Sequence, residues 1–384
     1  MNARERFIDC VKNGTEKPFV SLQIGAGAGF DCKLAGKEWI SEGTLEDTIR
    51  SYEIVGCEPL FNIGLPDLGS AVESLKWQQV HENTDILRKT FRSLETPFGQ
   101  ITVQFNEQKK HGMTPVKYAL TADSPNVFDI ISYYAEQHAK GIKAIPDLLK
   151  PHLQQAQSFG PVSVQWNIQP FELFGLPSVE SLAILAMLQP DPYHQCCNLI
   201  ADINIELIKA VFLAGADFVF LGAPGSEMLS PSIYEDFIVP YSQKITDAVH
   251  RMGGLIYSHI CSPVEPFLSM GHYNRMGIDL FETLSPPPVG NVASLTKARE
   301  VIDSCVCTRG NIGLDVLLNG TQEEVEQATI DVIEATKGSK HMVAASDYLF
   351  YDIPLENVKT VVKTTYEYSK STDKRTKDCS AKMT

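Results

Sequence analysis

Short apolar segments alternate with helix-like segments along almost the whole chain, and this alternation limits the folds open to it. Eight segments have the length and composition of buried β-strands, and from the third onward each gap holds a helical pattern. They are Lys17–Gly25, Cys57–Gly64, Val162–Ile168, Asp217–Ala223, Gly254–Ile260, Ile278–Leu284, Cys305–Ile312 and His341–Asp347. Because parallel strands that are apolar on both faces must be covered by helices, the pattern predicts an α/β fold, a (β/α)₈ TIM barrel. The alternative is an open doubly wound sheet, which usually has fewer strands.

Turn and capping signals mark the ends of several elements. Ser230-Pro231 has the form of a helix start, and Thr321 with Glu324 forms a capping box that opens another helix. Between the second and third units, Leu87–Phe105 holds two β-rich stretches around a turn and predicts a β-hairpin insertion. We expect residues 1–370 to form one barrel domain and the polar, lysine-rich residues 371–384 to be a disordered tail.

The overall charge and composition exclude several classes of partner. A formal net charge of −14 argues against nucleic acid or an anionic membrane as the main ligand. No apolar run approaches the about 20 residues of a membrane span, and the charged N-terminus does not have the form of a signal peptide. The nine cysteines lack the spacing of a disulfide framework, so we expect reduced thiols and a cytoplasmic protein.

The strands end in polar or ligand-capable residues, which packing alone does not explain. In a barrel of this type the active site forms at the carboxyl ends of the strands. The residues there are Gln23, Asn62, Asn167, Gln169, His259, Cys261, Glu282, Asn311 and Asp347. Some of the amides are expected to do no more than cap adjacent helices.

His259-Ile260-Cys261 is the most specific chemical signal in the chain. Residues two apart on a strand point to the same side, so an imidazole and a thiolate would project together, a pair that suits Zn²⁺. The following Ser262–Glu265 has the form of a helix start, whose N-terminus would favour the thiolate. The alternative is a hydrogen-bonded core histidine beside an inert buried cysteine.

A metal held by this pair needs at least one further ligand. Glu282 ends the next strand and Asp347 ends the last one, so both carboxylates are candidates. A His/Cys/carboxylate set with an open position is typical of a catalytic zinc site. Glu282 could instead orient His259 from outside the metal shell. Cys307 is a reserve ligand, but it lies four residues before its strand ends, which is too deep.

Several segments resemble the uroporphyrinogen decarboxylase superfamily. They are Ser230–Tyr241, Gly253–Cys261, Gly310–Ile312, Gly320–Val325 and Pro354–Val358. The resemblance implies a (β/α)₈ barrel. The decarboxylases of this superfamily carry an arginine-rich segment after the first strand that holds the substrate's carboxylates. The corresponding stretch here, Gln23–Phe30, has no arginine, which argues against a substrate with many carboxylates.

The chain is more similar to the corrinoid-dependent methyltransferase branch, which holds zinc with a His-x-Cys pair and a third cysteine. His259 and Cys261 match the pair, and Asp347 stands where the third cysteine is expected. The resemblance implies a zinc site made of these three residues. It also implies a corrinoid, such as methylcobalamin, that is carried on a separate partner protein.

We expect a methyl group to pass between that corrinoid and a small-molecule methyl donor or thiol acceptor. The candidate catalytic residues are Glu282 and Asn311, and the candidate substrate-binding residues are Gln23, Asn62, Asn167 and Gln169. Two alternatives remain open: a metal-free decarboxylase that acts on a smaller acid, and a non-catalytic binding barrel.

Overall fold

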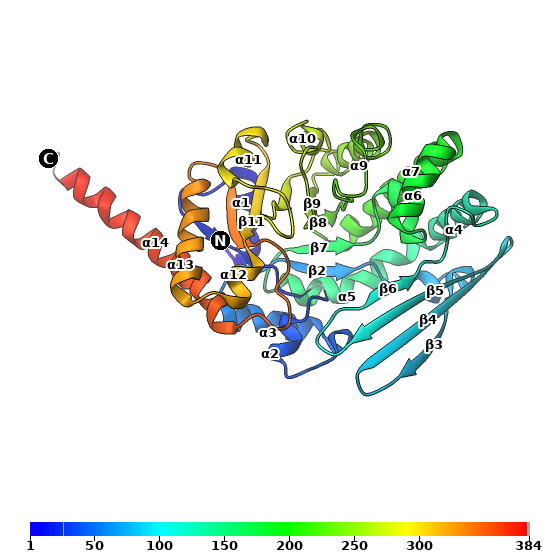
Figure 1. Ribbon diagram of the computed structural model, residues 1–384, viewed down its shortest axis with the longest axis horizontal. Helices are drawn as coiled ribbons and strands as arrows, with labels where there is room; N and C mark the ends of the chain where they lie inside the picture. Colours follow the sequence, from blue (N-terminus) through cyan, green and yellow to red (C-terminus); the bar gives the residue numbers. More distant parts are fainter. Residues whose placement is uncertain (26, 382–384) are drawn as a thin grey trace.

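Eight parallel strands form one curled sheet at the centre of the computed structural model, which describes residues 1–25 and 27–381, with side chains to residue 370 (Figure 1). The strands are β1 (Phe19–Val20), β2 (Phe61–Gly64), β7 (Val162–Gln165), β8 (Phe218–Phe220), β9 (Leu255–Ile260), β10 (Leu280–Thr283), β11 (Cys307–Ile312) and β12 (His341–Ala345). Their order in the sheet is β1-β12-β11-β10-β9-β8-β7-β2. Each of the eight predicted strand segments contains one of these strands. Strands that follow one another along the chain are neighbours in the sheet, except β1 and β2, which are its two end strands.

The two end strands of this sheet, β1 and β2, approach each other without a ladder of strand pairing among the described residues. The backbone amide of Glu58 donates to Val20 O over 3.1 Å. The buried Tyr52 hydroxyl lies 3.0 Å from Leu22 O and 3.2 Å from Leu60 O, so it connects the segments that contain the two strands. The predicted barrel order is therefore present, in a sheet that curls round toward closure.

Helices follow each strand and cover the outside of the sheet, as parallel strands require. They are α2 (Phe30–Leu34) and α3 (Leu45–Val55) after β1; α4 (Val127–Gly141) and α5 (Ile145–Gln157) after β2; α6 (Val179–Leu188) and α7 (Pro190–Ala214) after β7; α8 (Pro231–Ile233) and α9 (Val239–Arg251) after β8; α10 (His272–Arg275) after β9; α11 (Leu295–Val301) after β10; α12 (Leu314–Asn319) and α13 (Gln322–Ala335) after β11; and α14 (Leu355–Ala381) after β12. Among the described residues, no helix is both long enough and apolar enough to cross a bilayer.

The N-terminal helix α1 (Ala3–Asn13) packs against the interior of the sheet at the end opposite to the candidate site. Its Phe7 and Cys10 are fully buried in a cluster with Phe218, Cys307 and Met342. Cys307 therefore lies deep in the core, as predicted, and away from the strand ends. This apolar plug leaves the carboxyl ends of the strands as the end at which polar side chains gather.

Between β2 and β7 the chain forms a second, antiparallel sheet, in the order β3-β4-β5-β6. Its two long strands, β4 (Leu87–Thr96) and β5 (Gly99–Gln108), pair from Thr96 opposite Gly99 to Leu87 opposite Gln108. The predicted hairpin segment thus lies inside this sheet, which is wider than the prediction because β3 (Gln78–Asn83) and β6 (Thr114–Lys117) flank it. Figure 1 shows the long strands extending to one side of the parallel sheet.

Two of the three predicted helix starts are confirmed. Ser230 Oγ accepts from Ile233 N at the start of α8, and Thr321 with Glu324 forms the capping box of α13.

The third predicted start, Ser262–Glu265, is wrong because no helix begins at these residues, and the next helix, α10, begins at His272. The amides of Val264 and Glu265 instead donate to Asn291 Oδ1, over 2.9 and 3.0 Å. Pro266 follows Glu265, and a residue before proline is disfavoured in helical conformation. The expected helix-dipole stabilisation of a Cys261 thiolate is therefore withdrawn.

The prediction of a disordered tail at residues 371–384 remains a prediction. The structure draws 371–381 as the end of α14, and residues 382–384 lie outside the described residues. The assignment of residues 1–370 to one domain likewise remains a prediction.

The imidazole of His341, at the start of β12, should make folding sensitive to acid. Burial lowers its pKa to about 3, so the folded protein keeps it neutral, with Nε2 bonded to Gly310 O over 2.9 Å. The unfolded chain binds a proton on this ring below about pH 6.5. The free energy of unfolding therefore decreases as the pH is lowered from about 6.5 toward the folded-state pKa of about 3. Between pH 6.5 and 5 we expect His341 to lower the free energy of unfolding of the wild type by about 2 kcal/mol. His341→Gln should not show this decrease, and urea unfolding at each pH measures the difference. Parallel pH profiles of the two proteins would contradict this account.

Candidate metal centre

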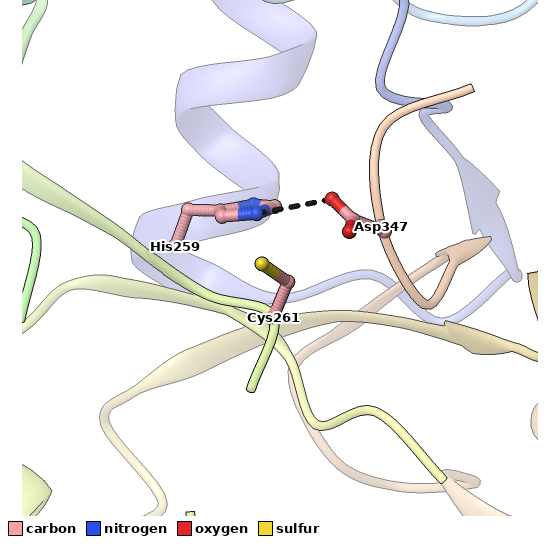
Figure 2. Close-up of side chains that lie close together, drawn as sticks. All are labelled: His259, Cys261 and Asp347. Carbon is pink, nitrogen blue, oxygen red and sulfur yellow. Dashed lines mark ion pairs between the residues drawn. The ribbon is translucent and has the colours of Figure 1, made fainter. Parts of the chain in front are cut away.

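Three side chains that can bind metal converge at the carboxyl ends of the strands: His259, Cys261 and Asp347. One ligand atom from each, a ring nitrogen, Sγ and a carboxylate oxygen, lies within 4.8 Å of the others. His259 Nε2 is 3.2 Å from Asp347 Oδ1. Figure 2 shows the three side chains pointing toward one another, with the sulfur of Cys261 beneath the imidazole and carboxylate.

The positions of these residues follow from strand geometry and sheet curvature together. His259 lies near the end of β9 and Cys261 directly after it, so the two-residue period of the strand points both side chains to the same side. Asp347 follows β12, which is separated from β9 by β10 and β11 in the sheet. The curl of the sheet is what brings this carboxylate across to the pair. The amide of Tyr348 fixes it by donating to Asp347 Oδ1 over 2.7 Å.

Glu282, on the adjacent strand β10, orients His259. Its register partner is His259 itself, and Glu282 Oε1 lies 2.8 Å from His259 Nδ1. When Nδ1 carries its proton toward this carboxylate, Nε2 is left as the free nitrogen that faces Cys261 and Asp347. A carboxylate behind a histidine ligand is the usual arrangement that sets the ring tautomer at a metal site. Among the described residues, Glu282 thus contacts the imidazole and is outside the three-residue cluster.

Glu282 is fully buried and held by several partners. Arg309 Nε lies 3.1 Å from its Oε2, Gln23 Nε2 donates to the same oxygen over 3.3 Å, and the Tyr257 hydroxyl donates to Oε1. Burial alone would raise the pKa of Glu282, but Arg309 and His259 outweigh it and hold this pKa below its usual value. The carboxylate is therefore charged and fixed in position.

The side chains around His259 favour its protonated form. Burial opposes the charge, but hydrogen bonds to Asp347, Cys261 and Glu282 outweigh it and raise the pKa of His259 well above its usual value. Metal ligation requires the neutral ring, so binding would release this proton.

The donor set fits zinc. Zinc sites combine cysteine sulfur, histidine nitrogen and carboxylate oxygen, at bond lengths of about 2.0 to 2.3 Å. The three candidate donor atoms lie close together, with His259 and Cys261 half-buried and Asp347 buried.

The remaining predicted site residues divide into two groups. Gln23 contacts Glu282, and Asn62 Nδ2 donates to the Tyr348 hydroxyl over 3.2 Å, so both lie beside the centre. Asn311 donates to Leu284 O over 2.8 Å, and the fully buried Gln169 donates to Ser242 Oγ over 2.8 Å. Asn167 is exposed. The structure does not bring these last three into the cluster.

Three residues beside the centre were not predicted: Tyr257, Tyr348 and Arg309. Tyr257 lies two residues before His259 on β9, so the period of the strand already placed it on the same side. Tyr348 follows Asp347, and its ring lies 4.7 Å from that of His259, centroid to centroid. Arg309 is the single charged residue in the predicted strand segment Cys305–Ile312, and this was the signal that could have identified it.

Comparisons with known proteins show where the chain belongs. The family profile described as Uroporphyrinogen decarboxylase (URO-D) matches residues 172–368, just over half of the chain. A uroporphyrinogen decarboxylase of Microcystis aeruginosa is 23% identical over 311 residues, which cover 79% of this chain and 84% of the relative. One from Prochlorococcus marinus (strain SARG) is 26% identical over 222 residues, which cover 55% of this chain and 58% of the relative.

A solved structure has the same fold. It is a methyltransferase from Methanosarcina mazei, with a TM-score of 0.63 at 19% identity, and the match covers 96% of this chain and 99% of that one. At 19% identity, this similarity shows a shared fold and nothing about activity. The family profile, which matches more than half of the chain, shows that the chain belongs to the uroporphyrinogen decarboxylase family.

Proposed function

We propose that this protein is a zinc-dependent methyltransferase that moves a methyl group between a small molecule and a corrinoid carried on a separate protein. The observation that carries the proposal is the convergence of His259 Nε2, Cys261 Sγ and the Asp347 carboxylate at the strand ends. The sheet would then be a closed (β/α)₈ barrel whose mouth receives both the small molecule and the corrinoid protein.

The residues of the centre have distinct roles in this proposal. His259, Cys261 and Asp347 would hold the metal, and a zinc ion supplies Lewis-acid chemistry, lowering the pKa of a thiol acceptor or polarising the heteroatom of a methyl donor. Glu282 keeps the proton of His259 on Nδ1 and so leaves Nε2 free. Tyr348 covers one face of the imidazole and limits the approach of water from that side.

A decarboxylase that acts on a smaller acid is the second candidate, because the curated relatives reported above are uroporphyrinogen decarboxylases. Binding a carboxylated substrate requires cationic donors at the mouth. Arg309 is charged but fully buried, and its Nε is held by Glu282 and by Ser21 O. The stretch after β1 supplies no arginine. The first candidate is therefore favoured.

Metal analysis separates the two candidates. We expect about one zinc per chain in protein purified without chelators. We also expect demethylation of methylcobalamin when a suitable thiol is supplied to accept the methyl group as a thioether. Cys261→Ala should lose both properties, whereas Cys305→Ala should keep them, because Cys305 is exposed and outside the cluster. Metal-free protein that releases CO₂ from a small acid would establish the decarboxylase instead.

A further inference from the structure

A cavity of about 410 Å³ lies beyond the carboxyl end of strand β7. Gln165, the last residue of β7, donates to the Tyr348 hydroxyl over 3.4 Å, and Tyr348 lies against His259. The next two residues of the chain, Trp166 and Asn167, line the cavity. The residue before the cavity is therefore connected to the centre through Tyr348, and none of the three candidate metal ligands lines the cavity.

Aromatic rings form a continuous wall of this cavity. Tyr134 packs edge-on to Trp77 at 6.4 Å and to Phe174 at 5.4 Å between centroids, and His138 stacks on Phe174 at 5.0 Å. Trp166 also lines the cavity. Partly exposed aromatic walls bind flat rings by stacking or cations by their π faces. The charges beside the wall decide between these two ligands.

The backbone after β7 is bent to hold part of the wall in place. Leu173 and Phe174 have φ of 47° and 62°, a left-handed conformation that non-glycine residues rarely adopt. Leu173 is fully buried and anchors the bend, whereas Phe174 lines the cavity. Unfavourable conformations of this kind persist where the surrounding structure requires them, commonly at ligand sites.

Arg92 is a cationic side chain beside the aromatic wall, and some of its N–H groups are available to bind a ligand. Its Nε donates to Gln79 Oε1 over 2.9 Å, while its two terminal nitrogens make no hydrogen bond or ion pair with any residue that the structure describes. The carboxylate of Asp67 is partly used, since its Oδ1 accepts from Gly69 N as the cap of a short turn. Burial lowers the pKa of His138, so this ring adds no charge at neutral pH. The free donors therefore favour an anionic group.

We propose that this cavity binds an aromatic carboxylate of the benzoate class. The ring would lie against the wall formed by Tyr134, Phe174 and the two tryptophans, and the carboxylate would pair with the terminal nitrogens of Arg92. A guanidinium presents paired donors that match the two oxygens of a carboxylate. The site requires no metal, so it can be tested independently of methyl transfer.

The tryptophans make the test direct. The chain has three of them, and two, Trp77 and Trp166, line the cavity. We expect benzoate to change the tryptophan fluorescence of a full-length Trp39→Phe protein in a saturable way. Benzamide, which has the same shape without the charge, should bind about 10- to 100-fold more weakly, and so should benzoate to Arg92→Gln in the same background. Arg92→Lys, which keeps the charge, should retain part of the affinity.

Lys89→Gln is the matched control. Lys89 lies on β4 with Arg92, but three positions away, so its side chain points to the opposite face. Benzoate should bind this variant as it binds the parent. Equal affinities for benzoate and benzamide would overturn the proposal, as would no saturable signal by either fluorescence or calorimetry. Tighter binding of phenyltrimethylammonium that is lost in Asp67→Asn would show a cation site instead.

Discussion

Cys261→Ala should weaken zinc binding by about 100-fold or more, because the substitution removes the sulfur donor of the three-residue cluster. Changes to residues outside the metal shell already cost about 10- to 100-fold, so loss of a direct ligand should reach or exceed the upper end of that range. Asp347→Ala removes another of the three ligands and should likewise cost about 100-fold. Asp347→Cys should retain zinc, because a thiolate is an equally good ligand. Competition with a zinc-binding indicator measures all three affinities in metal-stripped protein.

The controls for this series test position as well as chemistry. Cys305→Ala removes an exposed thiol and Cys307→Ala removes one that is buried in the plug behind the sheet. Cys305→Ala should leave zinc affinity unchanged, and so should Cys307→Ala provided that the variant folds. Wild-type affinity in both Cys261→Ala and Asp347→Ala would mean that these residues do not hold metal, and the proposed function would fall with them.

The strands were predictable because their signal is local. Each buried parallel strand is a short apolar run between turn residues, and its position does not depend on the rest of the chain. The full extent of the antiparallel sheet was harder to predict from the sequence. β3 is exposed along its whole length and β6 likewise, so neither shows the apolar alternation by which a strand is identified.

Within the candidate site, strand periodicity identified the groups that share a strand but not those that meet across the sheet. His259 and Cys261 are two residues apart, so their common direction follows from the pleat. Gln169 was assigned to the mouth by the same reasoning, but it precedes the 3₁₀-helix Pro170–Gly175, beyond β7, where the alternation of a strand no longer applies. Its side chain is buried against Ser242 instead.

The helix predicted at Ser262–Glu265 failed for a different reason. These residues do have the composition of a helix start. However, Pro266 disfavours a helical conformation at Glu265, and the amides of Val264 and Glu265 donate to the side chain of Asn291 instead. Asn291 follows β10 and lies 27 residues after Val264 and 26 after Glu265. A long-range contact of this kind cannot be predicted from the sequence of residues 262–265 alone.

Arg309→Met should lower the free energy of unfolding by about 3–5 kcal/mol, because it leaves the carboxylate of Glu282 buried without its cation. Both side chains are fully buried, and the ion pair joins Nε to Oε2 over 3.1 Å. The bond from Arg309 Nε to Ser21 O would be lost as well. Tyr257, Gln23 and His259 still contact Glu282, but only a protonated His259 offsets its charge. The midpoint of urea unfolding, with its slope, measures the loss.

The control for Arg309→Met is an exposed ion pair in which the guanidinium contacts both carboxylate oxygens. Arg275 contacts both oxygens of Glu235 over 2.6 Å, yet both side chains are exposed, so Arg275→Met should change stability only slightly. The double variant Arg309→Met with Glu282→Gln should recover part of the lost stability, since the buried charge is then gone on both sides. Glu282→Gln alone should weaken zinc binding, because the amide no longer holds the Nδ1 proton of His259 as a carboxylate does. If Arg309→Met unfolds at the same urea concentration as the wild type, Arg309 does not stabilise this carboxylate, and the orientation of His259 must depend on Tyr257 and Gln23 instead.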